Sequence, residues 1–335
     1  MALLEDIIDI SLEELEESLG EKKLPLFVKS SEVGFINRIQ KIVDIMNEDR
    51  SKKAIFVSGP TSSGKTTFTM RLTAGLEKAG RSAAFLSLDD YYIMNDLTFD
   101  RLGRPNFETI DAIDVERAHK DIHDIIEGKS VVPPYFDFMV RQQKERDPSD
   151  AIRLPEDGIL IVEGLHGLNR RISGDFGDEI LKVFIMPYGN VFGDTKLMDS
   201  GEIRLLRRIV RDRRHRGAHA LSTIDYWPMI AQSEEEYYSD YLSAADYHVN
   251  SFLPYESLII APMALADINE AMAMVKEGTI EPNIFMEKST SGKDFADFSA
   301  ALAYASKLLN DLNAIPKVNP SYVPAESILN EFISG

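Results

Sequence analysis

The sequence contains no cysteine among its 335 residues, which excludes disulfide bonds and thiolate metal sites. Basic charge is also scarce, since 37 Lys and Arg residues stand against 55 Asp and Glu residues, for a net charge of −18. We therefore do not expect a generally basic surface or a nucleic-acid partner. An anionic ligand would have to be held by a local group of cations.

Long apolar runs are missing as well. The longest apolar stretch, LIIAPMALA, is short and interrupted by Pro262, and the acidic N-terminus MALLEDIIDISLEELEE lacks the basic start of a signal peptide. We therefore expect a cytoplasmic protein without a membrane partner. A chain of this length is expected to form one large domain with attachments, or two domains.

The central part of the chain alternates between two patterns. Short apolar segments at 54–58, 83–90, 158–164 and 181–186 are typical of buried strands, and residues 65–78 and 114–128 show helical periodicity. This alternation predicts an α/β fold with a doubly wound parallel sheet. The flanks are predicted to be helical, at 11–18, where Ser11 and Glu14 form a capping-box pattern, and at 33–46, 264–278, 295–312 and 325–332.

A phosphate-binding pattern joins the first predicted strand to the first central helix. The segment GPTSSGKTT fits G-x-x-x-x-G-K-[ST] in the strand–loop–helix context that this motif requires. In such a loop backbone N–H groups converge on phosphate oxygens, the lysine neutralises the β and γ phosphates, and the next hydroxyl ligates Mg²⁺. We therefore expect a nucleoside triphosphate to be bound by Gly59, Pro60, Thr61, Ser62, Ser63, Gly64, Lys65, Thr66 and Thr67.

Acidic residues at the ends of two predicted strands help to distinguish a kinase from the other classes of protein that use this loop. The chain has no Asn-Lys dipeptide, so the guanine-reading N-K-x-D element is missing. In SLDDYY, Asp89 is placed where a carboxylate can accept a proton from an attacking hydroxyl, whereas Asp90 is interpreted as a helix cap. Glu163, at the end of GILIVEG, is expected to hold Mg²⁺ together with Thr66.

An arginine-rich helix is predicted at RLLRRIVRDRRHRG, which has seven arginines between Arg204 and Arg216. At 3.6 residues per turn, Arg204, Arg207, Arg208 and Arg211 share one face, and Leu and Ile side chains occupy the opposite face. We interpret the helix as a lid that clamps polyphosphate, with Arg207 and Arg211 stabilising charge in the transition state. A solvated helix face and a nucleic-acid patch are the alternatives.

Two aromatic segments are candidates for an acceptor pocket. NFETID contains Phe107 and Glu108, and PPYFDFMVR contains Phe136, Phe138 and Arg141. Aromatic rings with interleaved charge suit a binding pocket, and they equally suit an ordinary core and its rim.

Taken in order, GPTSSGKTT, SLDDYY, NFE, PYFDF, VEGLHGLN and RLLRRIVRDxxxRG resemble the uridine kinase and phosphoribulokinase family of P-loop kinases over roughly residues 30–335. The chain is most similar to bacterial uridine-kinase-like nucleoside kinases, in the form without a TGS module. The resemblance implies a P-loop kinase domain with its lid at 48–278, flanked by helical segments at 1–47 and 279–335. It also implies ATP and Mg²⁺ as cofactors.

The same resemblance implies roles for individual residues. Asp89 takes the position of the general base, Tyr92 lies near the acceptor, Glu108 takes the position that holds ribose hydroxyls, and Arg204 and Arg207 fall on lid arginines. The chain also departs from the family pattern: Phe136 stands where the family has a base-contacting Tyr, Arg141 stands where it has a His, and the segment PYGNVFGDTKLMDSGE lengthens the approach to the lid. A fixed cation at the second position would suit an acceptor that carries phosphate or carboxylate.

The sequence thus predicts an ATP- and Mg²⁺-dependent kinase that phosphorylates a hydroxyl, with the 5′-hydroxyl of a ribonucleoside as the favoured acceptor. One alternative is a sugar or sugar-phosphate kinase of the phosphoribulokinase type. The other is a regulatory ATPase whose arginine-rich helix binds RNA or a protein, although ATP hydrolysis alone would not need Asp89 at its strand end. Whether the chain forms a homo-oligomer stays open.

Overall fold

A five-stranded parallel sheet forms the centre of the protein, in a computed structural model that describes residues 7–93, 97–137, 140 and 142–334. The strand order is β10-β7-β2-β6-β3, and every neighbouring pair is parallel. The strands are β2 (Ala54–Ser58), β3 (Ala83–Ser87), β6 (Ile159–Glu163), β7 (Ile180–Met186) and β10 (Tyr247–Asn250). The doubly wound α/β prediction is confirmed, with β2 in the middle of the sheet.

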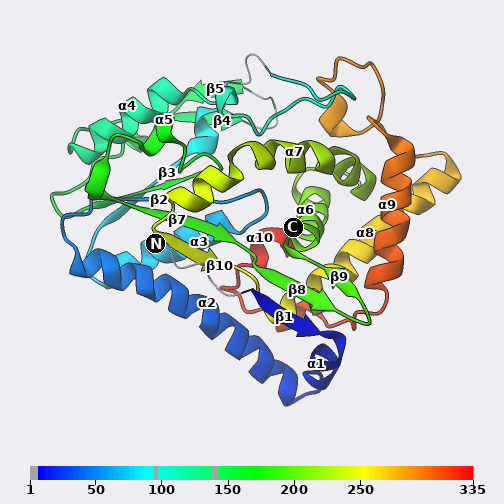
Figure 1. The fold of residues 1–335 in the computed structure, drawn as a ribbon. Helices are drawn as coiled ribbons and strands as arrows, with labels where there is room; N and C mark the ends of the chain where they lie inside the picture. Colours follow the sequence, from blue (N-terminus) through cyan, green and yellow to red (C-terminus); the bar gives the residue numbers. More distant parts are fainter. Residues whose placement is uncertain (1–6, 94–96, 138–139, 141, 335) are drawn as a thin grey trace.

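Helices cover both faces of this sheet, because its strands bury side chains on both sides. Ile55 and Val57 belong to one apolar cluster, and Ala54 and Phe56 belong to the other. The first face is covered by α2 (Lys23–Glu48), α3 (Lys65–Lys78), α6 (Ser200–His215) and α8 (Ser257–Glu277). The second is covered by α4 (Val115–Ile126), α5 (Arg170–Ser173) and the end of α7 (Ala220–Ala244) (Figure 1).

A second, smaller sheet lies at the lower edge of the molecule in Figure 1. Its strands are β1 (Ile8–Ser11), β8 (Gly189–Phe192) and β9 (Lys196–Met198), with β1 parallel to β8 and β8 antiparallel to β9. The sequence analysis assigned only helices to residues 1–47. The capping box at α1 (Leu12–Glu17) is confirmed, with the Glu14 backbone N–H 3.1 Å from Ser11 Oγ. Strand β1, which precedes this helix, is stabilised by pairing with β8, a partner from a distant part of the chain.

The C-terminal region completes the first apolar cluster. Helix α9 (Phe298–Leu312) agrees with prediction, whereas the predicted helix at 325–332 is observed only as α10 (Asn330–Ile333) after a series of turns. Ile328, Leu329 and Phe332 are fully buried in the same cluster as α2 and α3. The flanking segments therefore share a core with residues 48–278. The remaining hairpin, β4 (Pro134–Asp137) and β5 (Gln142–Glu145), is antiparallel.

One segment of the described chain, Pro254–Glu277, is long and apolar enough by composition to cross a membrane. Core helices of soluble proteins pass the same test. This segment contains α8, which continues through Pro262 and packs against α6 and α9, with Leu258 and Ile259 almost completely buried. The buried apolar side chains of α8 thus belong to the core.

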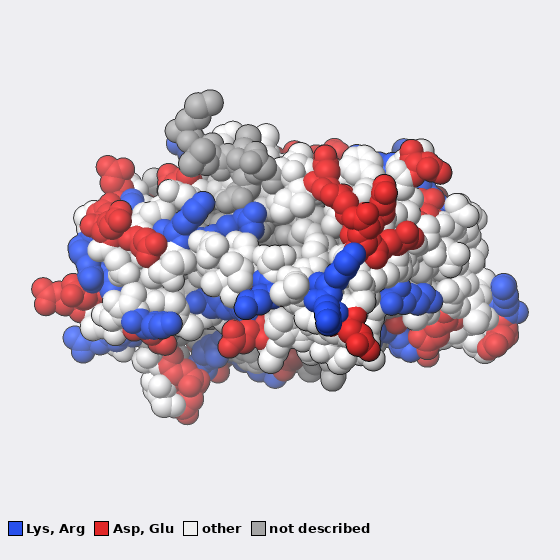
Figure 2. All heavy atoms as spheres, turned by 90° about the horizontal axis from the view of Figure 1, so that it is seen from below, with Lys and Arg blue, Asp and Glu red and all other residues white. Residues whose placement is uncertain are grey.

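The surface carries charges of both signs. On the face seen from below in Figure 2, acidic and basic side chains are interspersed, and the basic ones form no continuous stripe. On this face, the arrangement agrees with the expectation that the protein has no generally basic surface for nucleic acid.

Candidate active site

A cavity of about 500 Å³ opens at the carboxyl ends of β2, β3 and β6. Ligands bind at this edge in open α/β sheets, because loops that leave the strands diverge there. The cavity brings together three groups of side chains that are far apart in the sequence. They are the loop and carboxylate residues Thr61, Ser62, Lys65, Thr66, Asp89 and Glu163, the arginines Arg208, Arg211 and Arg216, and the residues Tyr92, Phe107, Glu108, Tyr226, Ile284, Phe285 and Glu287.

The loop between β2 and α3 has the conformation of a phosphate-binding loop. Ser62 and Gly64 have positive φ angles of 58° and 90°, so the chain turns tightly before α3 begins. A side chain at Gly59 would collide with the backbone of β7. Lys65 Nζ folds back over the loop and donates to the carbonyl oxygens of Gly59 at 3.0 Å and Pro60 at 3.2 Å. The ammonium group therefore borders the space that the loop encloses.

Polar groups inside the loop are left without partners. The hydroxyls of Ser62 and Ser63 are buried and have no hydrogen-bond partner within the described part of the chain. Unsatisfied buried polar atoms cost free energy. These two hydroxyls lie just before the N-terminus of α3, where the helix dipole favours an anion. The loop is therefore suited to phosphate.

Two acidic side chains border the same end of the cavity. Burial raises the pKa of Glu163 to about 8, with Lys65 opposing the shift and the Asp89 carboxylate adding to it. Burial also raises the pKa of Asp89. Together with the Thr66 hydroxyl, these groups form an oxygen donor set next to phosphate-binding N–H groups, which is the kind of set that Mg²⁺ prefers. Thr66 and Glu163 thus fit the metal role predicted for them.

Asp90 is placed differently from its neighbour. Its carboxylate pairs with Arg146 at 2.7 Å and accepts a hydrogen bond from the backbone N–H of Phe136 at 3.4 Å. It does not line the cavity, whereas Asp89 does. Asp89, and not Asp90, therefore stays the candidate base.

Three guanidinium groups at the end of α6 converge on one buried carboxylate. Asp212 lies 3.1 Å from Arg208, 3.6 Å from Arg211 and 3.2 Å from Arg216. Burial, and then the positive charges of the other two arginines, lower the pKa of Arg211 to about 10, with Asp212 opposing. The cluster carries more cations than its own carboxylate neutralises, so its positive charge is available to an anion in the cavity.

The other two arginines of α6 that were predicted to face the ligand are turned into the protein. Arg207 is completely buried, pairs with Glu256 at 2.6 Å and donates to the carbonyl of Ser62 at 3.2 Å. Arg204 pairs with Glu234 at 2.6 Å. Lid and substrate roles were predicted for these two arginines. Their contacts instead support the backbone of the phosphate-binding loop. The 3.6-residue period could not reveal this, because both faces of α6 are buried.

The sequence pattern gave Arg207 and Arg211 the same role, whereas their different surroundings predict different effects when each is replaced. Arg207→Ala leaves the carboxylate of Glu256 buried without its partner, so we expect the free energy of unfolding to fall by about 3–5 kcal/mol. Arg211→Ala removes one of three clustered cations, so we expect little loss of stability and a decrease in kcat of about 10²-fold. Denaturant unfolding and initial rates on both variants measure this. An Arg207→Ala protein of normal stability with low kcat would return Arg207 to a direct role.

The same cavity is lined by the predicted acceptor residues Tyr92, Phe107 and Glu108. Burial raises the pKa of Glu108, and Arg208, 3.7 Å away, opposes the shift. Phe136 does not line the cavity but packs behind Tyr92, with ring centroids 5.7 Å apart. The candidates Phe138 and Arg141 lie outside the described residues.

His166 contacts the backbone of Glu108 through a hydrogen bond. Its Nε2 lies 2.9 Å from the Glu108 carbonyl oxygen, which can only accept, so Nε2 carries the proton and Nδ1 accepts from the hydroxyl of Tyr241 at 2.8 Å. Burial lowers the pKa of His166 to about 4, so the ring stays neutral. His166, from the VEGLHGLN segment quoted for the resemblance, thus holds the backbone of Glu108, a candidate acceptor residue.

The sequence analysis missed cavity residues from α7 and from the C-terminal region. The ring of Phe285 lies 5.1 Å from that of Tyr226, and the guanidinium of Arg208 lies 5.5 Å from the centroid of Phe285. Asp225 anchors this wall by accepting a hydrogen bond from the side chain of Asn283 at 2.7 Å. Glu331 completes the lining beside the loop. Local sequence pattern does not show that these residues reach the cavity, because only the packing of the chain brings them there.

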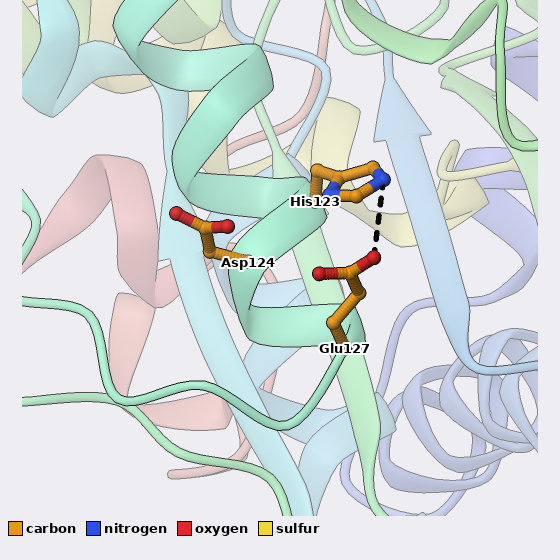
Figure 3. Close-up of side chains that lie close together, drawn as sticks. All are labelled: His123, Asp124 and Glu127. Carbon is orange, nitrogen blue, oxygen red and sulfur yellow. Dashed lines mark ion pairs between the residues drawn. The ribbon is translucent and has the colours of Figure 1, made fainter.

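A second cluster of potential metal ligands lies at the C-terminal end of α4, and none of its residues lines the cavity. It comprises His123, Asp124 and Glu127, and His123 pairs with Glu127 at 3.6 Å (Figure 3). Asp124 is already bonded to Lys120 at 2.7 Å and Lys129 at 2.8 Å. Two ammonium groups on one carboxylate oppose a cation, so we do not assign a metal to this cluster.

A phosphate-binding loop follows the central strand β2, and carboxylates stand at the ends of β6 and β3 on one side of it. This is the arrangement of a P-loop kinase. Within this class the chain belongs to the Phosphoribulokinase / Uridine kinase family, whose family model matches residues 54–253, more than half of the chain. The protein is thus a kinase, of a family that acts with ATP on nucleosides or sugars.

Two relatives with known names agree with this assignment. The chain is 31% identical to a uridine kinase of Macrococcus caseolyticus over 179 residues, which are 53% of this chain and 77% of the relative. It is 28% identical to a uridine kinase of Staphylococcus aureus over the same shares. A solved structure described as a possible uridine kinase from Bacillus stearothermophilus has 16% identity and a TM-score of 0.43, and the match covers 63% of this chain and 97% of that one.

Proposed function

We propose that the protein transfers the γ-phosphoryl group of ATP to the 5′-hydroxyl of a ribonucleoside such as uridine or cytidine. The observation that supports this best is that one cavity holds the phosphate-binding loop, the candidate base Asp89 and the acceptor candidates Tyr92, Phe107 and Glu108. Phosphoryl transfer depends mainly on positioning and charge stabilisation, and this cavity offers residues for both.

The nucleotide would be bound at the loop end. Backbone N–H groups at the start of α3 and the ammonium of Lys65 would hold the phosphates. Thr66 and Glu163 would hold Mg²⁺, which supplies positive charge next to the transferring group. Arg211 and its neighbours carry a surplus of positive charge at the cavity wall, where charge spreads over the phosphoryl oxygens.

The acceptor would be bound at the aromatic end. Phe107, Tyr226 and Phe285 present rings on which a planar base can stack, and Glu108 offers a carboxylate to a ribose diol. Asp89, which lines the same cavity, would accept the proton of the 5′-hydroxyl. Two relatives named uridine kinase favour this acceptor.

A sugar or sugar phosphate is the second candidate. It is favoured by the surplus of cations around Asp212, because a phosphorylated acceptor would bring its own negative charge into the cavity. Arg208, the member of this cluster that lies 3.7 Å from Glu108, would contact such a group.

The test is a panel of acceptors at one ATP concentration, containing uridine, cytidine, their 2′-deoxy forms, ribulose 5-phosphate and simple sugars. Loss of the 2′-hydroxyl leaves the Glu108 carboxylate partly unpaired, so kcat/KM should fall by roughly 10- to 100-fold for the deoxynucleosides. Turnover confined to the anionic sugar would overturn the nucleoside assignment. ADP release stimulated by RNA and by no small acceptor would favour the regulatory ATPase.

A further inference from the structure

The C-terminal segment 327–332 is packed directly against the phosphate-binding loop. Ile328 occupies the space beside Gly64 that a side chain there would need, and Phe332 places its ring 5.0 Å from the guanidinium of Arg207. The hydroxyl of Ser327 lies 3.0 Å from that of Tyr255. All three segment residues are at most 1% exposed, and α10 lies beside α6 (Figure 1). Apolar packing therefore anchors the segment.

This anchored segment brings one carboxylate into the cavity. Glu331 Oε2 accepts hydrogen bonds from the backbone N–H and from the hydroxyl of Thr67, both at 3.1 Å. Thr67 is the third residue of α3, so its N–H is among the first four of the helix, which have no acceptor within the helix. These N–H groups are the ones that a P-loop offers to phosphate.

The carboxylate is poorly suited to the position once an anion arrives. Glu331 shares the cavity with Asp89 and Glu163, and its negative charge contributes to the raised pKa of Glu163. A phosphate oxygen and a carboxylate oxygen cannot both accept from the same two Thr67 donors at hydrogen-bond distance without strong repulsion. The side chain of Glu331 is partly exposed, unlike Ile328 and Phe332, so it can turn away while the segment stays in place.

We propose that Glu331 is an internal competitor of the nucleotide, which occupies the Thr67 donors in the free enzyme and leaves them when the triphosphate binds. This inference rests on the proposed function, because it assumes that the loop binds ATP. The C-terminal segment then sets the nucleotide affinity of the enzyme: it shapes the loop through its apolar residues and weakens nucleotide binding through one carboxylate.

The experiment is calorimetric titration with Mg·ADP and, separately, with inorganic pyrophosphate, without an acceptor. Wild type is compared with Glu331→Gln, which keeps the shape of the side chain but not its charge, and with Glu331→Ala. We expect both variants to bind ADP and pyrophosphate about tenfold more tightly, since removal of one charged competitor is worth about 1.4 kcal/mol. The matched control is Glu326→Gln, an exposed position in the same region, which should bind like wild type.

The outcomes distinguish this inference from the proposed function. If wild type binds Mg·ADP and both Glu331 variants bind it equally or more weakly, Glu331 is not a competitor and the inference is overturned. Equal tightening by Glu326→Gln would also overturn it, because the effect would then come from net charge alone. Failure of wild type to bind ADP or pyrophosphate would instead overturn the proposed function.

Discussion

Replacing Lys65 with alanine should lower kcat by about 10³-fold while the protein stays folded. The ammonium group borders the loop and the cavity and makes no ion pair among the described residues; its hydrogen bonds go to two carbonyl oxygens of the loop. Stability therefore depends little on it, whereas the charge on the transferring phosphoryl group would lose its nearest lysine. Initial rates with saturating acceptor and a thermal unfolding curve measure the two effects.

The matched control is Lys78→Ala, at the exposed last residue of the same helix. This variant removes the same side chain from α3 at a distance from the loop, so its kcat should equal that of wild type. Near wild-type turnover by the Lys65 variant would remove the loop from the active site. A decrease in kcat shared by both lysine variants would point to a general effect of charge.

Asp89→Asn should lower kcat by about 10²-fold or more and change nucleotide affinity little. The amide keeps the shape of the side chain but cannot accept the proton of the attacking hydroxyl. Because burial raises the pKa of Asp89, kcat of the wild-type enzyme should also fall as the pH decreases toward that pKa, since only the ionised carboxylate acts as a base. Single-turnover rates and ADP titrations separate catalysis from binding.

Asp90→Asn serves as the comparison for this variant. Asp90 pairs with Arg146 and lies outside the cavity lining. Loss of its charge should therefore lower the free energy of unfolding and change kcat only slightly. If Asp90→Asn proved the more damaging change in single-turnover rate, the roles of the two carboxylates would be reversed.

Local sequence pattern predicted the parts of this protein that depend on neighbouring residues. The strand at 54–58, the loop and the helix at 65–78 follow from apolar alternation, glycine placement and helical periodicity, and the structure has β2 and α3 at the same residues. Asp89 and Glu163 could be placed at one edge of the sheet, because the carboxyl ends of parallel strands meet there. The cavity lining contains both.

Patterns of this kind failed where a residue's environment comes from distant segments. The side chain of Arg207 is oriented by its contacts with Glu256 and with the loop carbonyls. A helical wheel of α6 shows none of these groups, because they belong to other segments. Strand β1 depends on β8, and a four-residue strand without its partner has no stable form. The predicted helix at 325–332 is reduced to α10, because the packing of Ile328 against the loop imposes turns on the residues before it.

The sequence by itself determined the class of fold, the phosphate-binding loop and the carboxylates beside it, because each depends on residues that are adjacent or on strand ends that every parallel sheet brings together. Only the tertiary structure decided which arginines reach the cavity, which aromatic residues close it, and that Glu331 meets Thr67 across 264 positions of chain. Such contacts are made by packing between distant segments, and no local periodicity encodes them.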